Sequence, residues 1–307
     1  MDQLKLNITS ETSQLGIVVL GIADSPGPVP TLENVYDPKS WENIQNGTYP
    51  KETDMVMEME AFNKVFLKHG VEVLRPENIE NCNQIFTRDI AFVIDDYLFK
   101  SNILPLRESE LQAINYIIAK INPEKVISLP ENVHVEGGDV MMWKDYIFIG
   151  TYKGENYADF ITARTNLQAV KFLTEFFPNK KVVDFDLIKS NTRARENALH
   201  LDCIFQPVGE NYGIIYKDGF RDKSGYDFLV SLFGIKNLFH ITQEEMYNMY
   251  SNVFSIAPDI VVSEKGFTRL NTWLREKDIL VEEIPYKEIS KQEGLLRCST
   301  LPLYRYE

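Results

Sequence analysis

The sequence predicts an α/β fold in which one helix-strand unit is repeated five times around an axis. In each unit an amphipathic helix leads into a short apolar strand and then into a loop. A repeat of this length is typical of closed or stacked architectures, in which neighbouring units bury one another's apolar faces. No Pro/Gly/Ser-rich linker divides the sequence, so we expect a single domain over residues 1–307. The five units span Met55–Pro76, Arg107–Pro130, Thr165–Phe185, Ser224–Thr242 and Gly266–Tyr286.

A buried strand and a long loop precede the first unit. The continuous apolar run Gly16–Ala23, followed by a Pro/Gly-rich stretch, predicts the strand and its end. The loop reaches about Thr53, and loops longer than about 15 residues in a compact domain are usually functional or disordered. Aromatic residues favour an ordered flap near a substrate entrance: Tyr36, Trp41 and Tyr49.

The first unit illustrates why each unit is predicted to form a helix followed by a strand. Apolar residues recur every three or four positions from Val56 to Phe66, which gives a helix one apolar face. Gly70 is suited to end that helix, and the run 71–74 follows as a short strand. The alternative is a set of plain βαβ crossovers in an open parallel sheet. The same helical spacing occurs at 111–118, 167–176, 228–233 and 270–274.

A second regularity favours the repeat over the open sheet. Asp89, Asp139 and Asp202 each precede two apolar runs that are joined by a turn. Apolar runs separated by a few turn-forming residues are typical of β-hairpins. Each module is therefore expected to run strand, strand, helix, strand. The second run opens with a tyrosine in all three cases, at Tyr97, Tyr146 and Tyr212.

Composition excludes several classes of function. The net charge of −13 argues against nucleic-acid binding, which needs clustered Lys and Arg, and is compatible with solubility or with a cationic small substrate. Three cysteines, an odd and sparse count, suit a reducing compartment without a disulfide framework. No signal peptide and no apolar run of roughly 18–20 residues is evident, so we expect a cytoplasmic protein without a membrane partner. A homo-oligomer remains an open alternative.

Cys298 is the candidate nucleophile. A neighbouring cation lowers the pKa of a thiol, and Arg297 stands directly before this cysteine. The alternative is inert packing, which we expect for Cys82 and for Cys203, the latter in an apolar hairpin strand.

His200 and the Glu136–Asp139 loop are the other candidates for chemistry. In a strand, His200 and Asp202 would face the same side and could reach one pocket. Gly137 and Gly138 separate two carboxylates and would let a ligand approach the backbone closely, although a plain polar turn has the same composition. No Cys-x-x-Cys or His-x-x-x-His spacing supports zinc, so no metal is expected.

Together these residues suit a guanidinium substrate. A guanidinium carries five N–H donors in a fixed fork, which carboxylates can hold by charge-assisted hydrogen bonds. A thiolate can then attack the central carbon, and a histidine can protonate the departing nitrogen and later deprotonate the incoming nucleophile. The fourth loop, Ala257–Asp259, offers nothing distinctive.

Four motifs, in this order, resemble the guanidino-group-modifying superfamily of arginine deiminases, dimethylarginine dimethylaminohydrolases and amidinotransferases. They are Phe86-Thr87-Arg88-Asp89, Glu136-Gly137-Gly138-Asp139, His200-Leu201-Asp202 and Arg297-Cys298-Ser299-Thr300-Leu301-Pro302-Leu303. The resemblance covers nearly the whole chain. It implies a five-bladed α/β propeller, the pentein fold, with pseudo-five-fold ββαβ repeats, and it implies no metal or organic cofactor.

The resemblance also implies a role for each motif residue. Cys298 would form a covalent amidino-cysteine intermediate, His200 would act as general acid and base, and Glu136 would orient His200 or the guanidinium. Asp89 and Asp202 would bind the guanidinium. Further candidates for the substrate-binding shell are Arg88 and Asp139, which would shape the motif loops with Thr300, and Arg297.

The reaction type stays open between two close readings. Only Gly294 stands where many arginine deiminases have a glycine-rich run, and there is little room for their extra helical insertion. We favour a hydrolase that cleaves a C–N bond of arginine or a substituted arginine, with an amidinotransferase as the alternative. A citrulline ureido hydrolase and a non-catalytic binding propeller are further alternatives. Arg193, Arg195 and Arg297 are candidates by position for reading the substrate's carboxylate.

Overall fold

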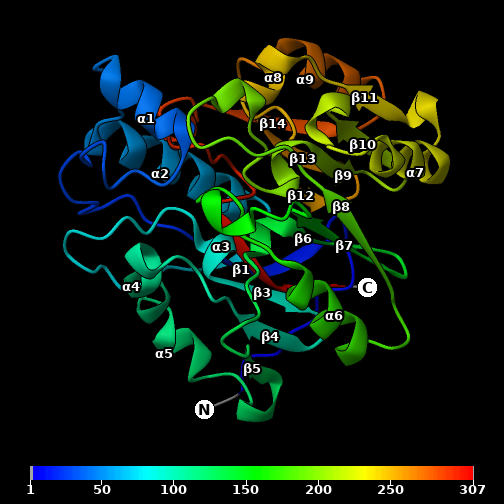
Figure 1. The fold of residues 1–307 in the computed structure, drawn as a ribbon, viewed down its shortest axis with the longest axis horizontal. Coiled ribbons are helices and arrows are strands. Elements are labelled where there is room, and N and C mark those ends of the chain that lie inside the picture. The colour runs from blue at the N-terminus through cyan, green and yellow to red at the C-terminus, as the bar shows by residue number, and fades with distance from the viewer. Residues whose placement is uncertain (1–2, 307) are drawn as a thin grey trace.

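The computed structural model describes residues 3–306 as a mixed α/β fold with five three-stranded sheets (Figure 1). In every sheet the central strand pairs antiparallel with one neighbour and parallel with the other. The sheets are β15 (Thr300–Arg305), β1 (Leu15–Leu20) and β2 (Glu72–Leu74); β3 (Ala91–Ile94), β4 (Tyr97–Lys100) and β5 (Val126–Ser128); β6 (Val140–Trp143), β7 (Tyr146–Thr151) and β8 (Lys181–Asp186); β9 (Phe205–Val208), β10 (Tyr212–Ile215) and β11 (Leu238–His240); β12 (Phe254–Ala257), β13 (Ile260–Glu264) and β14 (Leu280–Ile284).

A helical segment connects the two parallel strands of every sheet. The connecting helices are α2 (Glu52–Lys68), α4 (Glu108–Gln112) with α5 (Asn115–Ile118), α6 (Leu167–Phe176), α7 (Lys223–Phe233) and α9 (Thr268–Arg275). The predicted order of strand, strand, helix, strand is therefore confirmed in five sheets. The first sheet takes its first strand, β15, from the C-terminal end of the described chain. Figure 1 shows these helices toward the outside of the molecule and the strands nearer its centre.

One predicted helix differs from the structure. The spacing over 111–118 predicts a continuous helix, but the structure has two short helices with a break at Ile114, where φ is −107° and ψ is 7°. The side chains of Ile114 and Ile117 are buried in the same core as strands β3 to β5. Tertiary packing of branched side chains therefore sets the backbone here in place of helix propensity.

The predicted hairpins are present, and their tight turns have the backbone conformation that such hairpins need. Residue pairs Ile94–Tyr97 and Trp143–Tyr146 close two-residue turns, whose first residues, Asp95 and Lys144, have positive φ angles of 52° and 53°. Primed turns need that backbone conformation, because it matches the twist of the flanking strands. The β9–β10 turn is longer, and Cys203 lies before β9 rather than in the strand that we predicted.

Polar segments precede the first strand of every sheet. They are α3 (Thr87–Ile90), the 3₁₀ turns Gly137–Asp139 and Leu201–Cys203, the pair Ser251-Asn252, and the run 297–299. Contacts of α3 with the Gly137–Asp139 turn, and of that turn with Leu201–Cys203, bring the segments together. The fourth loop was predicted wrongly, because Ala257–Asp259 forms the turn between β12 and β13 and the equivalent segment is Ser251-Asn252.

The predicted flap is ordered and contains helix α1 (Pro38–Gln45). Helix α1 contacts the 3₁₀ turn Ile289–Gln292, which precedes the Cys298 segment. Helix α8 (Gln243–Tyr247) lies just before Ser251-Asn252 in the chain. Among residues 3–306, no helix has the length and apolar character that crossing a membrane requires.

Candidate active site

Cys298 lies in a buried pocket formed by three of the polar segments. Its side chain is 3% exposed, and its Sγ is 3.6 Å from Asp202 Oδ2. The side-chain amide of Asn252 donates to the same sulfur at 3.2 Å, and its Oδ1 accepts from the backbone N–H of Cys298 at 3.1 Å. Two groups from neighbouring repeats therefore fix the position of the thiol.

The charge around Cys298 differs from the sequence prediction. Burial raises the pKa of the Cys298 thiol well above its usual value, and the nearby Asp202 and Asp89 raise it further. The predicted lowering by Arg297 is not found, because that guanidinium is paired with Glu11 and with Asp202. In the unliganded site Cys298 is therefore a neutral thiol at neutral pH.

His200 is held by an ion pair deep in the site. Its Nε2 is 2.8 Å from Glu136 Oε2, and Arg164 Nη1 donates to both oxygens of the same carboxylate at 3.0–3.1 Å. Burial alone would raise the pKa of Glu136, but Arg164 and His200 hold it well below its usual value. Burial alone would lower the pKa of His200, but Asp89 and Asp139 raise it to about 9. His200 is thus an imidazolium at neutral pH.

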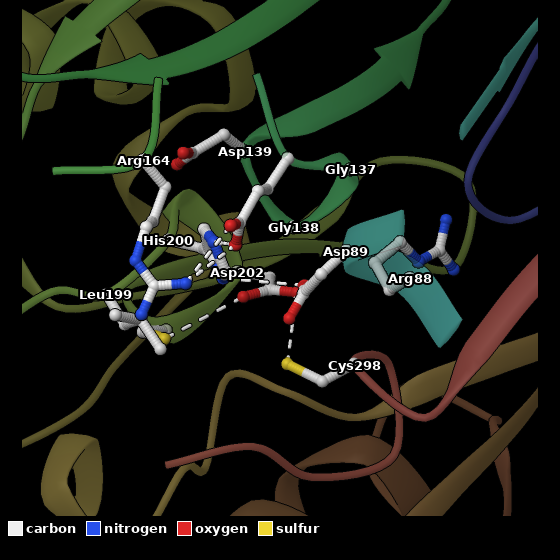
Figure 2. A network of polar contacts seen from close by, with 12 residues as sticks. Arg88, Asp89, Gly137, Gly138, Asp139, Arg164, Leu199, His200, Asp202 and Cys298 are labelled. Atoms are coloured by element: carbon white, nitrogen blue, oxygen red, sulfur yellow. Dashed lines mark hydrogen bonds and ion pairs between the residues drawn. The ribbon is translucent and has the colours of Figure 1, made fainter. Parts of the chain in front are cut away.

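Asp89 faces His200, and one of its two carboxylate oxygens accepts a hydrogen bond while the other does not. Its Oδ2 accepts from Arg107 Nη1 at 2.9 Å, and Arg107 is also paired with Glu110 through two hydrogen bonds. Asp89 Oδ1 and His200 Nδ1 lie 3.7 Å apart, and both are buried without a hydrogen-bond partner in the part of the chain that the structure describes. Figure 2 shows the Asp89 and Asp202 carboxylates between His200 and Cys298.

The same cluster has the spacing of a metal site, but its charges do not suit a metal. One ligand atom each of Asp89, Glu136 and His200 lie within 4.8 Å of one another, the one such group found among residues 3–306. Metal ligation needs a neutral imidazole, because an imidazolium has no free lone pair. The raised pKa of His200 and the two arginines on these carboxylates therefore fit a proton-carrying site better than a metal centre.

Gly137 and Gly138 allow close packing within the protein and do not serve the approach of a ligand. A Cβ on Gly137 would meet the backbone oxygen of Arg88 at 2.2 Å, and one on Gly138 would meet the His200 ring at 2.6 Å. The prediction that this loop lets a ligand approach the backbone is therefore corrected. The two glycines let the Glu136–Asp139 loop pack directly against α3 and His200.

Two further predicted residues, Asp139 and Arg88, form hydrogen bonds that hold the loops of the site together. Asp139 accepts from the Leu201 backbone N–H at 2.9 Å and from Thr165 Oγ1 at 2.6 Å. Arg88 reaches the Arg297 carbonyl and Thr300, and Figure 2 shows its side chain directed away from the other labelled site residues.

Arg297 is fully buried and satisfied inside the protein. Its Nη1 and Nη2 also donate to the backbone carbonyls of Gly138 and Val140, at 3.3 and 2.7 Å. With Glu11 and Asp202 as further partners, this guanidinium has no donor directed at a ligand. The structure thus gives Arg88 and Arg297 loop contacts, where the sequence suggested substrate contacts.

Tyr36 of the flap covers the site. Its ring lies 5.4 Å from the guanidinium carbon of Arg107 and 5.6 Å from that of Arg164, and its carbonyl accepts from Arg164 Nη2 at 2.8 Å. A cavity of about 640 Å³ opens on the other side, lined by Tyr36, Glu110 and flap prolines. Cys298 and His200 do not line this cavity, whereas Glu110, which binds Arg107, does.

Sequence reasoning missed Asn252, Arg107 and Arg164, and it named Tyr36 only as part of a flap near a substrate entrance. Asn252 could have been found by its position, since it stands two residues before β12 as Asp89 stands two before β3. The two arginines carry no local motif, because they reach the site from connecting segments and only the folded chain brings them to Asp89 and Glu136.

Comparison with known proteins identifies the family. The model for the family described as "N,N dimethylarginine dimethylhydrolase, eukaryotic" matches residues 39–305. The chain belongs to this family. The resemblance read from the motifs is confirmed, and this dimethylarginine dimethylhydrolase family member falls within the guanidino-modifying pentein superfamily.

Individual proteins similar to the chain include an uncharacterized protein and several arginine deiminases. YkgA, an uncharacterized protein of Bacillus subtilis, is 30% identical over 247 residues, 77% of this chain and 78% of its own. The arginine deiminase of Limosilactobacillus reuteri is 25% identical over 263 residues, 73% of this chain. The match covers 61% of that deiminase, so the family member spans less than two thirds of it.

Solved structures share the fold. A substrate-bound mutant of the N-terminal domain of ArgZ, an arginine dihydrolase from cyanobacteria, aligns with a TM-score of 0.77 at 18% identity, covering 94% of this chain and 98% of that domain. The inosamine-phosphate amidinotransferase StrB1 of Streptomyces griseus aligns with a TM-score of 0.76 at 15% identity, covering 98% and 97% of the two chains. The arrangement of small sheets seen here is therefore that of these proteins.

Proposed function

We propose that this protein is a cysteine-dependent enzyme that hydrolyses a C–N bond at the guanidino carbon of arginine or of a substituted arginine. The observation that supports the proposal is that His200 Nδ1 and Asp89 Oδ1 face each other at 3.7 Å, both buried and without a hydrogen bond among the described residues, while the Asp89 charge acts on Cys298. A buried polar atom without a partner costs about 1–3 kcal/mol, so a ligand that donates a hydrogen bond to Asp89 Oδ1 is favoured. A planar guanidinium supplies the donors that Asp89 lacks.

Substrate binding would activate the thiol. The charges of Asp202 and Asp89 raise the pKa of Cys298 in the empty site. A guanidinium cation between these carboxylates offsets their charge and lowers that pKa, because opposite charges nearby favour the thiolate. Cys298 thus becomes a nucleophile when its substrate is present and stays a neutral thiol otherwise.

The first half-reaction would transfer the guanidino carbon to sulfur. The Cys298 thiolate forms a bond to that carbon, and the electron pair of one C–N bond leaves with the departing nitrogen. His200, already an imidazolium, donates the proton that releases this nitrogen as ammonia or as a substituted amine. Glu136 holds the ring by its Nε2, which leaves Nδ1 directed to the gap.

In the second half-reaction His200, now neutral, takes a proton from water. The water oxygen bonds to the same carbon, the carbon-sulfur bond breaks, and the ureido product leaves. With arginine the products would be citrulline and ammonia. The thiol proton passes to solvent when the substrate binds, and the second proton of the attacking water passes to the departing sulfur. The cycle thus uses only water and returns Cys298 to the thiol and His200 to the imidazolium.

We further propose that two arginines meet the other end of the substrate. Arg193 and Arg195, which we considered for this role, are exposed and paired with Glu196 and Glu244. Arg107 and Arg164 instead lie beside Asp89 and Glu136 under the Tyr36 ring. Withdrawal of Tyr36 would expose both guanidinium groups to a substrate carboxylate, for which arginine has the right geometry.

The fold supports this arrangement. We infer that the five sheets are the blades of one α/β propeller with pseudo-five-fold symmetry, and that residues 1–307 act as one domain. The same strand order in each sheet supports the inference, as does completion of the first sheet by β15. The five polar segments at the start of the blades would then surround one centre.

An amidinotransferase is the second candidate, favoured by the likeness to StrB1 over nearly the full length of both chains. Both reactions share the first half and differ in whether water or an amine attacks the intermediate.

Product analysis tests the proposal. Purified protein is incubated with L-arginine and, separately, with Nω-methylated arginines, each with and without glycine as an amine acceptor. We expect citrulline with ammonia or the matching methylamine, formed without acceptor. Ornithine that appears only with the acceptor would replace the hydrolase by the transferase. Wild-type protein that forms no more product than the Cys298→Ala variant would overturn the proposal.

A further inference from the structure

We propose that Asn252 is a catalytic residue that stabilises the Cys298 thiolate through its side-chain N–H; the inference rests on the proposed role of Cys298 as nucleophile. Asn252 is fully buried and comes from the one polar segment that the sequence motifs did not mark. Its Nδ2 lies 3.2 Å from Cys298 Sγ. Within residues 3–306 this is the one side-chain N–H that donates to the sulfur; a hydrogen bond with the Leu295 backbone also lowers the pKa of the thiol.

The amide holds Cys298 at two points. While Nδ2 donates to the sulfur, Oδ1 accepts from the Cys298 backbone N–H at 3.1 Å. The backbone oxygen of Asn252 also accepts from the Arg297 N–H at 3.3 Å. Donor and acceptor of one side chain thus face the thiol and the backbone of the same residue, which selects one orientation of the sulfur.

The segment that carries Asn252 is itself fixed. Ser251 Oγ donates to the Asp202 carbonyl at 2.8 Å, and Nδ2 of Asn252 lies 3.5 Å from the same oxygen. Met249, just before, has a positive φ of 67° and accepts from the Asn252 N–H at 2.9 Å. The position of the amide is therefore set by the loop as well as by its contacts with Cys298.

The need to stabilise a thiolate explains why this repeat carries an amide where two others carry a carboxylate. Asp89 and Asp202 supply carboxylates from equivalent segments, and their charges disfavour a thiolate. A further carboxylate against the sulfur would disfavour it more. A neutral N–H donor stabilises the thiolate without weakening the hold of the carboxylates on a guanidinium. The Arg297 cation is paired with Glu11 and Asp202 and is not available to stabilise the thiolate. The amide of Asn252 provides that stabilisation instead.

The alternative is that Asn252 only anchors the backbone of Cys298. Three variants separate the two roles: Asn252→Ala removes donor and acceptor, Asn252→Asp keeps an acceptor for the backbone N–H and loses the amide donor, and Asn248→Ala is the matched control. The readout is the rate at which iodoacetamide alkylates Cys298 between pH 7 and 9.5, followed by peptide mass. Thermal melts establish that each variant is folded.

If Asn252 stabilises the thiolate, alkylation slows about 10-fold in Asn252→Ala, the loss of one hydrogen bond, and slows further in Asn252→Asp. Asn248→Ala stays within about twofold of wild type, as its amide donates to the Glu244 carbonyl and not to the sulfur. A wild-type rate in Asn252→Asp with a slow Asn252→Ala would show a backbone anchor and overturn the inference. Wild-type rates in both would overturn it as well.

Alkylation also separates this inference from the proposed function. It reads the thiol without any guanidino substrate. If the predicted order of rates is found but no guanidino compound is turned over, the role of Asn252 at the thiol stands and the proposed reaction fails. If arginine derivatives are turned over but Asn252→Asp alkylates at the wild-type rate, the reaction stands and the inference fails.

Discussion

Two buried polar clusters lie near the Cys298 segment and use similar residue types differently. The reactive cluster consists of Asp89, Glu136, His200 and Cys298. The flap cluster, which joins α1 to the segment before Cys298, consists of Asp37, Lys39, Asn197 and Glu293. Both contain two carboxyl groups and a basic group that are nearly inaccessible to solvent.

Hydrogen bonding distinguishes the two. Glu293 accepts from Asn197 Nδ2 at 2.6 Å and from the Lys39 backbone N–H at 3.2 Å, and Lys39 Nζ donates to the Tyr247 carbonyl at 2.6 Å. Asp37 caps α1 by accepting from the Ser40 N–H at 2.7 Å. None of the buried polar side-chain atoms of the flap cluster is unpaired among the residues described.

The reactive cluster, in contrast, leaves Asp89 Oδ1 and His200 Nδ1 without partners among residues 3–306. An unpaired buried group is costly, and such groups persist where a ligand completes them. The two clusters therefore share burial and charge, and they differ in that two buried atoms of the reactive cluster face each other without hydrogen bonds. The predictions below test this distinction, from the largest effect to the smallest.

Replacing the nucleophile should have the largest effect. We expect Cys298→Ala to lower kcat by on the order of 10⁴-fold or more, because no other group in the described site can form the covalent intermediate. Arginine binding, measured by calorimetry, should persist. The matched control is Cys203→Ala, a second buried thiol 3.7 Å from the other oxygen of Asp202, which should keep most of its activity. Equal losses in the two variants would argue against Cys298 as the nucleophile.

Replacing His200 should stop the reaction at a different point. His200→Asn keeps a donor for Glu136 but removes the proton donor and acceptor, so we expect kcat to fall about 10²–10⁴-fold. Any adduct that forms should accumulate and appear by intact mass. Wild-type kcat/KM should fall as pH rises through about 9, where His200 loses its proton. His240→Asn, which changes a histidine paired with Tyr226, should leave this limb of the profile in place.

Asp89→Asn tests whether the unpaired oxygen serves a ligand. We expect KM for arginine to rise about 10–100-fold, the value of a charge-assisted hydrogen bond. Burial raises the pKa of Asp89, so its charge is already unfavourable in the empty site, and the variant should melt at or above the wild-type temperature. A marked fall in melting temperature with unchanged KM would place Asp89 with the structural anchors.

The sequence predicts the order of strands and helices better than it predicts the charge around Cys298. Helical and hairpin periodicity is local, so the order of strands and helices could be read directly. Motif order located Cys298, His200 and Asp89. The sign of the Cys298 pKa shift was wrong, because a cation adjacent in sequence, Arg297, is engaged elsewhere in space.

Long-range contacts account for the residues that were missed. Arg164 reaches Glu136 from 28 positions further along the chain, and Asn252 reaches Cys298 across 46. No short motif surrounds either one. The break in the predicted helix at Ile114 has the same origin, since buried packing and not local propensity decides it.

Glu293→Gln should have the smallest effect on chemistry and a clear effect on pH dependence. Burial, with the Asp37 carboxyl group beside it, raises the pKa of Glu293 to about 8, and an acid in the unfolded chain has its ordinary pKa of 4.5. The folded state therefore binds one more proton between these values. The stability from this group is complete below about pH 4.5 and is lost as pH rises through about 8, with a slope of up to about 1.4 kcal/mol per pH unit.

Glutamine imitates the protonated carboxyl and cannot ionise, so this slope should flatten in Glu293→Gln while kcat at pH 7 stays close to wild type. Urea unfolding between pH 5 and 8.5 measures the slope, and Glu131→Gln makes the same chemical change on the surface. His200 contributes a slope of the same sign toward higher pH in both proteins and cancels in the comparison. An unchanged slope together with a large loss of kcat would mean that the flap cluster takes part in the reaction, and the distinction drawn from hydrogen bonding would then fail.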